Sequence, residues 1–143
     1  MSKIETNSSI HIGHFGRVAY MEPQILVNPY FQYIKPSDIY SYGVLLWEIS
    51  SGYPPFKNKF NNRNAIIHAI VNNRAREITI LNTPEDYEKL YKKCWNQEPE
   101  QRPSIEEILK EFSKMDVKIS IYLYNKNKIF FFNDFISIYI NLY

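Results

Sequence analysis

The segment of residues 37–52 constrains the fold more than any other part of the chain. One set of its apolar side chains recurs at helical spacing, and Val44 and Trp47 occupy much of the remaining circumference. The set consists of Ile39, Tyr42, Leu45, Leu46 and Ile49. A helix that is apolar nearly all round belongs in the centre of a core. Ser37 is its predicted N-cap, and Gly52 is expected to end it.

Three more helices are predicted after this segment. The first covers about 62–72, and the last starts at Ser104, where Ser104 and Glu107 fit a capping box. The middle helix has Thr83 as N-cap and Pro84 at the first helical position. Its apolar face consists of Tyr87, Leu90, Tyr91, Cys94 and Trp95, and its i,i+4 ion pairs are Glu85–Lys89 and Glu88–Lys92. With a short helix expected after Pro23, the fold class is mainly α.

Changes in composition divide the chain into three parts. Residues 1–10 are polar and predict a flexible N-terminus, 11–115 contain the helical domain, and 116–143 form a hydrophobic, low-complexity tail. Residues 117–124 alternate apolar and polar side chains, which predicts a strand. The following apolar run is too short, and too interrupted by Asp134, to indicate a membrane span. The tail's Ile, Phe, Tyr, Asn and Lys fit either translated non-coding sequence or a genuine C-terminal extension.

Charge and cysteine content exclude several classes of partner and compartment. The 17 basic and 15 acidic residues leave a net charge of only +2, so neither nucleic acid nor a membrane is expected as a partner. The single cysteine, Cys94, cannot form an intrachain disulfide and is expected to be a packed, inert thiol. No apolar stretch follows a basic region at the start, so no secretory signal is predicted. We therefore expect a cytoplasmic, intracellular protein.

Five motifs in order across residues 15–113 resemble the C-terminal lobe of a protein kinase catalytic domain. Their spacing is closest to tyrosine kinases and tyrosine-kinase-like kinases. The motif residues carried over from that family are Glu22, Pro23, Gln24, Asp38, Gly43, Trp47, Trp95 and Arg102. The resemblance implies a partial kinase domain with a helical C-lobe, in which both tryptophans are core residues. The family's A-P-E appears as Glu22-Pro23-Gln24, and the match implies a contact between Gln24 and Arg102.

Asp38 matches the aspartate that, in the family, holds backbone amides of the catalytic loop. That loop's H-R-D motif does not occur in this sequence, so only a structural role is implied for Asp38. The four glycines, at 13, 16, 43 and 52, form no phosphate-binding loop, and no lysine stands in a V-A-I-K context. His14-Phe15-Gly16 imitates the metal-binding D-F-G, but histidine is a poor ligand for Mg²⁺. His11, His14 and His68 share no metal-ligand spacing.

These absences predict no catalytic, cofactor-binding or metal-binding residue in the chain; ATP and Mg²⁺ belong to the parent family. The first functional hypothesis is a truncated protein kinase domain. Its parent would transfer the ATP γ-phosphate to a protein hydroxyl, and the chain alone would be inactive. The alternative is a non-catalytic, pseudokinase-like module that binds protein partners. Loss of the other lobe would expose apolar surface, which favours association.

Overall fold

The computed structural model describes residues 17–115 together with Ile119, Tyr122 and Asn125. The described residues contain five α-helices and two 3₁₀ helices, and no strand occurs among them. In chain order these are η1 (Val18–Tyr20), α2 (Pro23–Val27), α3 (Lys35–Ser51), α4 (Arg63–Val71), α5 (Glu85–Cys94), η2 (Pro99–Gln101) and α6 (Ile105–Lys114). The mainly α fold class is confirmed.

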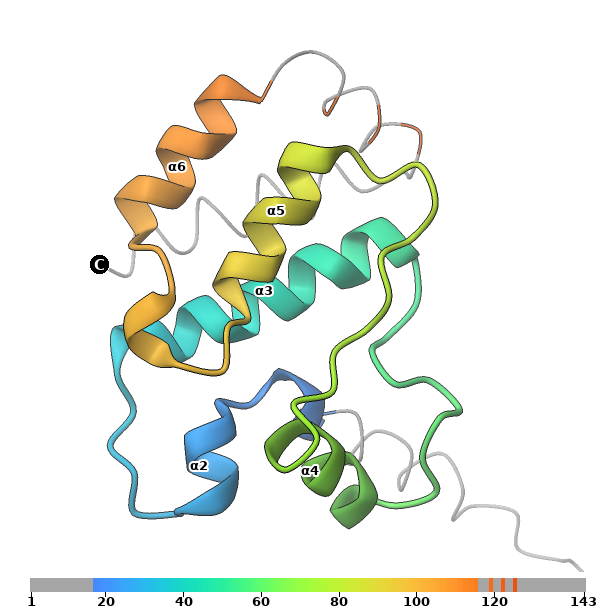
Figure 1. The fold of residues 1–143 in the computed structure, drawn as a ribbon, viewed down its shortest axis with the longest axis vertical. Coiled ribbons are helices and arrows are strands. Elements are labelled where there is room, and N and C mark those ends of the chain that lie inside the picture. Colours follow the sequence, from blue (N-terminus) through green and yellow to red (C-terminus); the bar gives the residue numbers. More distant parts are fainter. Residues whose placement is uncertain (1–16, 116–118, 120–121, 123–124, 126–143) are drawn as a thin grey trace, which may run out of the picture.

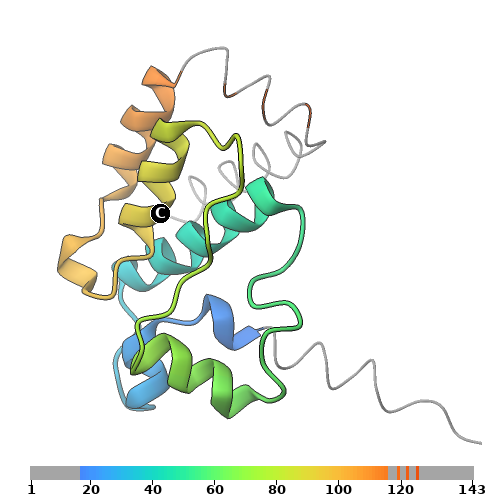
Figure 2. The same ribbon diagram turned by 45° about the vertical axis from the view of Figure 1, so that its right-hand side comes forward.

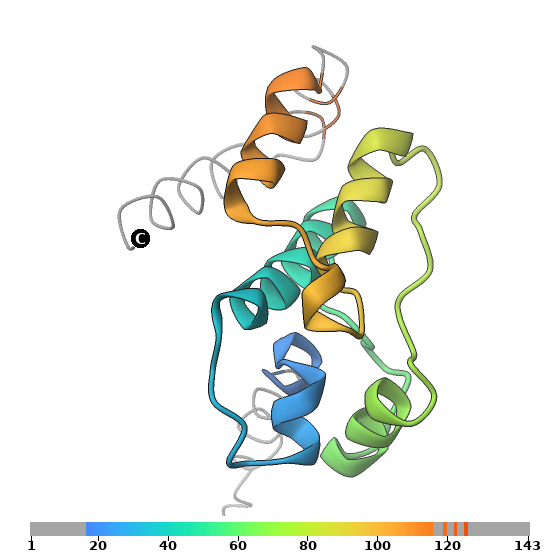
Figure 3. The ribbon, with the colours of Figure 1, turned by 60° about the vertical axis from the view of Figure 1, so that its left-hand side comes forward.

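The long helix α3 lies between two groups of elements (Figure 1). Helices α5 and α6 lie on one side of it, and α2, α4 and η1 lie on the other, as the turned views also show (Figures 2 and 3). Its main contact is with α5, whereas α2 packs mainly on α4. The central position predicted for the apolar helix is therefore confirmed.

The core consists of two clusters of buried side chains. The larger joins α3, α5 and α6 and includes Leu46 and Trp47, both of which are fully inaccessible to solvent. The smaller joins η1 to α4 and includes Val18, Phe56 and Ile70. Because α3 contributes buried residues around most of its circumference, the sequence could assign it to the centre without knowing its neighbours.

The starts of two helices differ from the predicted ones, by three residues in α3 and by one residue in α5. Helix α3 begins at Lys35 with Ile34 as its N-cap, so the assignment of Ser37 as N-cap is wrong. Pro36 lies in the first turn, where its missing N–H does no harm. Ser37 instead lies one turn inside, and its Oγ accepts a hydrogen bond from the Ile34 N–H at 3.3 Å. Helix α5 likewise begins at Glu85, one residue later than predicted.

The other predicted helix ends are close to the observed ones. The N-cap Ser104 and its capping box with Glu107 are confirmed, because Ser104 Oγ accepts from the Glu107 N–H at 3.2 Å and Glu107 Oε2 accepts from the Ser104 N–H at 2.7 Å. Helix α3 ends at Gly52, whose φ of 79° is a left-handed conformation that favours glycine. The helix predicted over about 62–72 corresponds to α4, and both predicted ion pairs of α5 are present.

The described part of the tail differs from the predicted strand. Ile119, Tyr122 and Asn125 have helical conformation, and Ile119 and Tyr122 both pack against the larger core cluster. A three-residue spacing places two side chains on the same side of a helix, which a strand would not do. The predicted flexible segment 1–10 and most of the tail lie outside the described residues. No helix within the described ranges is long and apolar enough to cross a membrane.

Candidate functional site

The guanidinium group of Arg102 links three separate segments of the chain. Its Nη1 donates to the carbonyl of Pro36 in the first turn of α3 at 2.8 Å. Its Nε donates to the carbonyl of Asn96 at 2.8 Å, and Nη2 donates to that of Gln97 at 3.1 Å. The other two N–H groups bind both carboxylate oxygens of Glu22. All five donors of the guanidinium group are therefore used inside the protein.

Glu22 is the acidic partner of Arg102, and both side chains are inaccessible to solvent. Glu22 is also the N-cap of α2, because its Oε1 accepts from the Gln24 N–H at 3.3 Å. A bidentate carboxylate–guanidinium contact is charge-assisted and directional, so it fixes α2 relative to α3 and η2. The cost of burying each charge is offset only because the other charge and the surrounding carbonyls are present.

The predicted contact between Gln24 and Arg102 is wrong. The motif alignment placed the acidic position at Gln24, but the structure brings Glu22, two residues earlier, to the arginine. Gln24 lies inside α2, half-buried, and its backbone carbonyl accepts from Asn28 N–H at 2.9 Å. The spacing of the motif could not reveal this shift because a helix starting at Pro23 turns positions 22 and 24 in different directions.

Tyr40 and Arg76 complete the site, and neither was identified from the sequence. The Arg102 and Arg76 guanidinium carbons lie 5.1 and 5.2 Å from the centre of the Tyr40 ring. Arg76 donates to the carbonyl of Trp95 at 3.0 Å and to the side chain of Gln97 at 2.8 Å. We call Glu22, Tyr40, Arg76 and Arg102 the Arg102 cluster. Only the tertiary fold brings them together, since the first and last are 80 positions apart.

Burial sets the electrostatics of the Arg102 cluster. It raises the pKa of the Tyr40 hydroxyl, although the two neighbouring arginines lower it in part. It also lowers the pKa of Arg76, which the charge of Arg102 lowers further. Both effects reflect the cost of a charge in a poorly solvated place. Stacking on the Tyr40 ring and hydrogen bonds to carbonyls stabilise the two guanidinium groups in the cluster, although Glu22 is its only carboxylate.

Gly43 permits α3 and α5 to approach each other closely. A Cβ at this position would lie 2.7 Å from the Cβ of Cys94 and 2.7 Å from the backbone N of Trp95. Cys94 is fully buried at this contact, and burial raises the pKa of its thiol to about 12. The prediction of a packed thiol is confirmed; that it is inert stays a prediction, which the raised pKa supports because the thiolate is the reactive form.

Both tryptophans are core residues, as predicted. Trp47 is fully buried, and its Nε1 donates to the carbonyl of Ile78 at 2.9 Å. Trp95 is 5% exposed and packs edge-on against Tyr91, with ring centroids 5.0 Å apart. Pro23 is buried at the start of α2.

Asp38 lies half-buried in the first turn of α3. Its Oδ1 accepts a hydrogen bond of 2.6 Å from the hydroxyl of Tyr33, a residue that precedes the helix. This contact suits an acidic side chain near a helix N-terminus. The structural role that the family resemblance implies for Asp38 stays a prediction.

Glu77 fixes the loop between α3 and α4 and was not identified from the sequence. Its side chain is buried, accepts from the Phe56 N–H at 2.5 Å and forms an ion pair with Lys59. Phe56 has a φ of 56°, a left-handed conformation that is uncommon for an aromatic residue. The carboxylate therefore stabilises a strained turn that keeps the Phe56 ring in the smaller core cluster.

Three histidines and a D-F-G-like sequence are the features of the sequence that bear on metal binding. No group of three or more potential metal ligands occurs among them. His68 is exposed on α4, as expected for a surface histidine. His11 and His14 lie outside the described part of the chain, as does the D-F-G-like sequence.

Comparison with known proteins agrees with this arrangement. The family model described as protein tyrosine and serine/threonine kinase matches residues 3–112. The chain belongs to this protein kinase family. The family match covers α2 to α5, most of α6 and the whole Arg102 cluster, and its end precedes Ile119 and Tyr122.

Several kinase relatives are identical to this chain at about a third of the aligned positions. Mixed lineage kinase domain-like protein from Homo sapiens is 36% identical over 95 residues, which is 66% of this chain and 20% of the relative. Mitogen-activated protein kinase kinase kinase 7 from Mus musculus is also 36% identical over 95 residues, or 16% of its length. Mitogen-activated protein kinase kinase kinase 12 from Rattus norvegicus is 33% identical over 108 residues, which is 76% of this chain and 12% of the relative. The matched part thus spans a fifth or less of each relative.

Proposed function

We propose that these 143 residues are the helical part of a protein kinase domain and do not transfer phosphate by themselves. The observation that carries this proposal is the Arg102 cluster, in which all five guanidinium donors and both Glu22 oxygens are used internally. Such a site fixes helices and has no free group for a phosphate. Phosphoryl transfer also needs groups that hold phosphates, bind metal and orient a hydroxyl. ATP and Mg²⁺ would be bound by other parts of such a domain.

A phosphotransfer assay tests this proposal. The purified 143-residue chain would be incubated with radiolabelled ATP, Mg²⁺ and generic protein substrates. We expect no incorporation above that of a heat-denatured sample, and no rise in melting temperature with ATP and Mg²⁺, because a ligand stabilises only a protein that binds it. ATP-dependent incorporation that stays with the folded chain through a final gel-filtration step would overturn the proposal.

A second candidate function is a non-catalytic module that binds a protein partner. The end of α2 and the connector that follows it support this function, because Val27 on the helix is 64% exposed and Tyr30 and Tyr33 on the connector are 95% and 56% exposed. Beside it lies a cavity of about 360 Å³ whose lining includes Phe31 and Arg74. Aromatic side chains and arginine are enriched where proteins bind each other.

The two candidates differ in what the connector does. If the chain is a binding module, we expect a monodisperse protein that melts cooperatively. The Tyr30→Ser variant would then bind a purified partner more weakly without a lower melting temperature. Leu81→Ser is the matched control, since Leu81 is 85% exposed on a different loop. Equal loss of binding with both variants would indicate nonspecific apolar adhesion, and aggregation of the wild-type chain would count against a module.

A further inference from the structure

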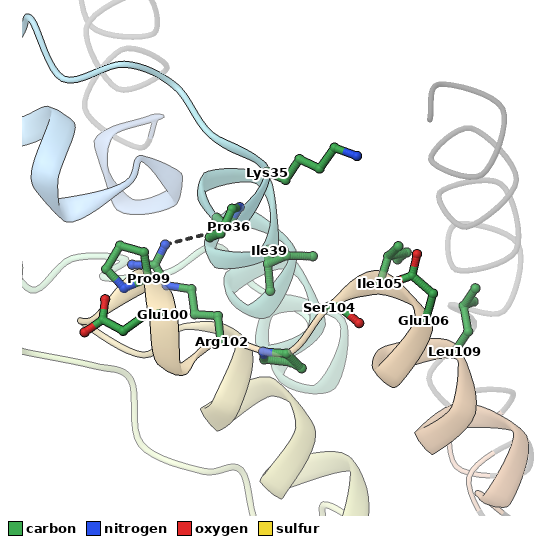
Figure 4. A pocket seen from close by; sticks show the side chains of 11 residues that line it. Lys35, Pro36, Ile39, Pro99, Glu100, Arg102, Ser104, Ile105, Glu106 and Leu109 are labelled. Atoms are coloured by element: carbon green, nitrogen blue, oxygen red, sulfur yellow. Dashed lines mark hydrogen bonds between the residues drawn. The ribbon is translucent and has the colours of Figure 1, made fainter.

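A cavity of about 500 Å³ lies between the start of α3, η2 and the start of α6. Figure 4 shows Pro36 and Ile39 on α3 across from Ile105 and Leu109 on α6. These four side chains give the cavity apolar walls. Its volume is within the range that binds a ligand or several side chains. An apolar hollow of this size is costly to leave open to water.

The segment after α6 is anchored at the other end of α3. Ile119 is 7% exposed within the larger core cluster. The Tyr122 hydroxyl lies 3.3 Å from Thr83 Oγ1 and donates to the carbonyl of Ser50 at 3.4 Å. Its ring lies 6.2 Å from that of Tyr87. The chain therefore contacts the core beyond the family match, which ends at residue 112.

We propose that the chain's own residues 126–143 dock into this cavity. From Ser50 back to Ile39 is eleven residues of α3, or about 17 Å at the helical rise. The eighteen residues after Asn125 span about 27 Å even at that rise, so they can reach the cavity from the Tyr122 anchor.

The composition of the segment matches the walls of the cavity. From residue 129 to 143 the only charged side chain is Asp134, and Phe130, Phe131 and Phe132 stand in succession. Burying one such aromatic side chain stabilises a fold by about 1.5–3 kcal/mol. The cavity lining carries Glu100 and Glu106 as well as Lys35, so the match rests on the apolar walls. The tail is then a genuine part of the fold that covers an apolar surface of the kinase-type helices. This inference does not depend on the proposed function.

The test measures how fast a thiol on the cavity wall is alkylated in the full-length chain. Leu109→Cys reports on the wall, and Lys110→Cys, on the exposed side of the same helix, is the matched control. Cys94 gives little background because it is fully buried and burial raises its pKa to about 12. We expect Leu109→Cys to react at least about tenfold more slowly than Lys110→Cys, because a covered thiol reacts only on local opening.

A tail variant identifies what covers the wall. Replacing Phe130, Phe131 and Phe132 by serine should raise the Leu109→Cys rate about tenfold and leave the Lys110→Cys rate unchanged. Ile136→Ser is a milder second variant, and circular dichroism confirms that each protein still melts cooperatively. Equal rates at the two cysteines, or no effect of either tail variant, would overturn the proposal. So would a Leu109→Cys rate that falls with protein concentration, since a second copy would then cover the wall.

Discussion

Two arginine–glutamate pairs that end on the same loop differ in almost every physical respect. Arg102 and Glu22 have no exposed side-chain surface, whereas the side chains of Arg74 and Glu98 are 69% and 36% exposed. The first pair is bidentate and surrounded by carbonyl acceptors; the second has one contact of 3.3 Å. The buried pair therefore fixes three chain segments relative to one another, whereas the exposed pair of the same residue types lies on the surface. Burial, rather than the presence of an ion pair, decides which.

Removing Arg102 should have the largest effect. Arg102→Ala leaves the Glu22 carboxylate buried without its cation, and we expect a loss of about 3–5 kcal/mol in the free energy of unfolding. Urea denaturation measures it. Because the two groups act as a pair, the double variant with Glu22→Ala should lose less than the sum of the single variants. Strictly additive losses would show that the pair is not coupled.

The packing that surrounds the buried pair should be nearly as sensitive. Gly43→Ala puts a methyl group 2.7 Å from the Cys94 Cβ and the Trp95 backbone N, so α3 and α5 must separate. We expect a loss of about 1–3 kcal/mol in the free energy of unfolding and an altered near-ultraviolet circular dichroism of the tryptophans. Lys93→Ala on the exposed side of α5 is the control. A spectrum unchanged by Gly43→Ala would contradict this close approach.

Alkaline pH should weaken the same contact through Cys94. Its pKa is about 12 in the fold, against an ordinary value of 9.0. Between these values the thiol stays protonated when folded but ionises when unfolded, so stability is intact below pH 9 and falls as pH rises towards 12. The slope is at most about 1.4 kcal/mol per pH unit from this group. Denaturation from pH 8 to 11 measures it, and Cys94→Ala should make the slope shallower. An unchanged slope would mean that other groups, such as the buried tyrosines, dominate.

The exposed pair should contribute little. Arg74→Ala is expected to lower the free energy of unfolding by about 0.2–1 kcal/mol, as for other solvent-exposed ion pairs, and the effect should shrink at high salt. A loss as large as that of Arg102→Ala would remove the contrast between the two pairs.

The smallest effect is expected for Gln24→Glu. The motif alignment predicted that this change would restore a charged pair with Arg102. The structure leaves Arg102 no free N–H for it, so we expect a change within about 0.5 kcal/mol in the free energy of unfolding. A clear rise in melting temperature that is absent when Arg102 is replaced by lysine would show that residue 24 contacts the arginine after all.

The sequence by itself determined the helices and the order of the kinase-type motifs. Periodicity was sufficient for α3, α4, α5 and α6 because each has a recognisable buried face, and Ser104 with Glu107 was sufficient for one helix start. The start of α3 was misplaced because Ser37 resembles an N-cap but lies in the third helical position, where it bonds back to Ile34. A sequence pattern indicates which hydrogen bonds a residue can form with its neighbours in the chain. It misplaced the start of α3 because Ser37 can serve either as an N-cap or as the third helical residue.

Only the tertiary structure decided which side chains form the site. Whether Glu22 or Gln24 meets Arg102 depends on how α2 is rotated against α3, and that rotation is set by packing between segments 80 positions apart. The same packing places Arg76 and Arg102 over the Tyr40 ring. No sequence spacing predicts such a contact between a cation and an aromatic ring. The helical conformation of Ile119 and Tyr122 was likewise decided in the tertiary structure, because packing against the core can override the strand preference of an alternating sequence.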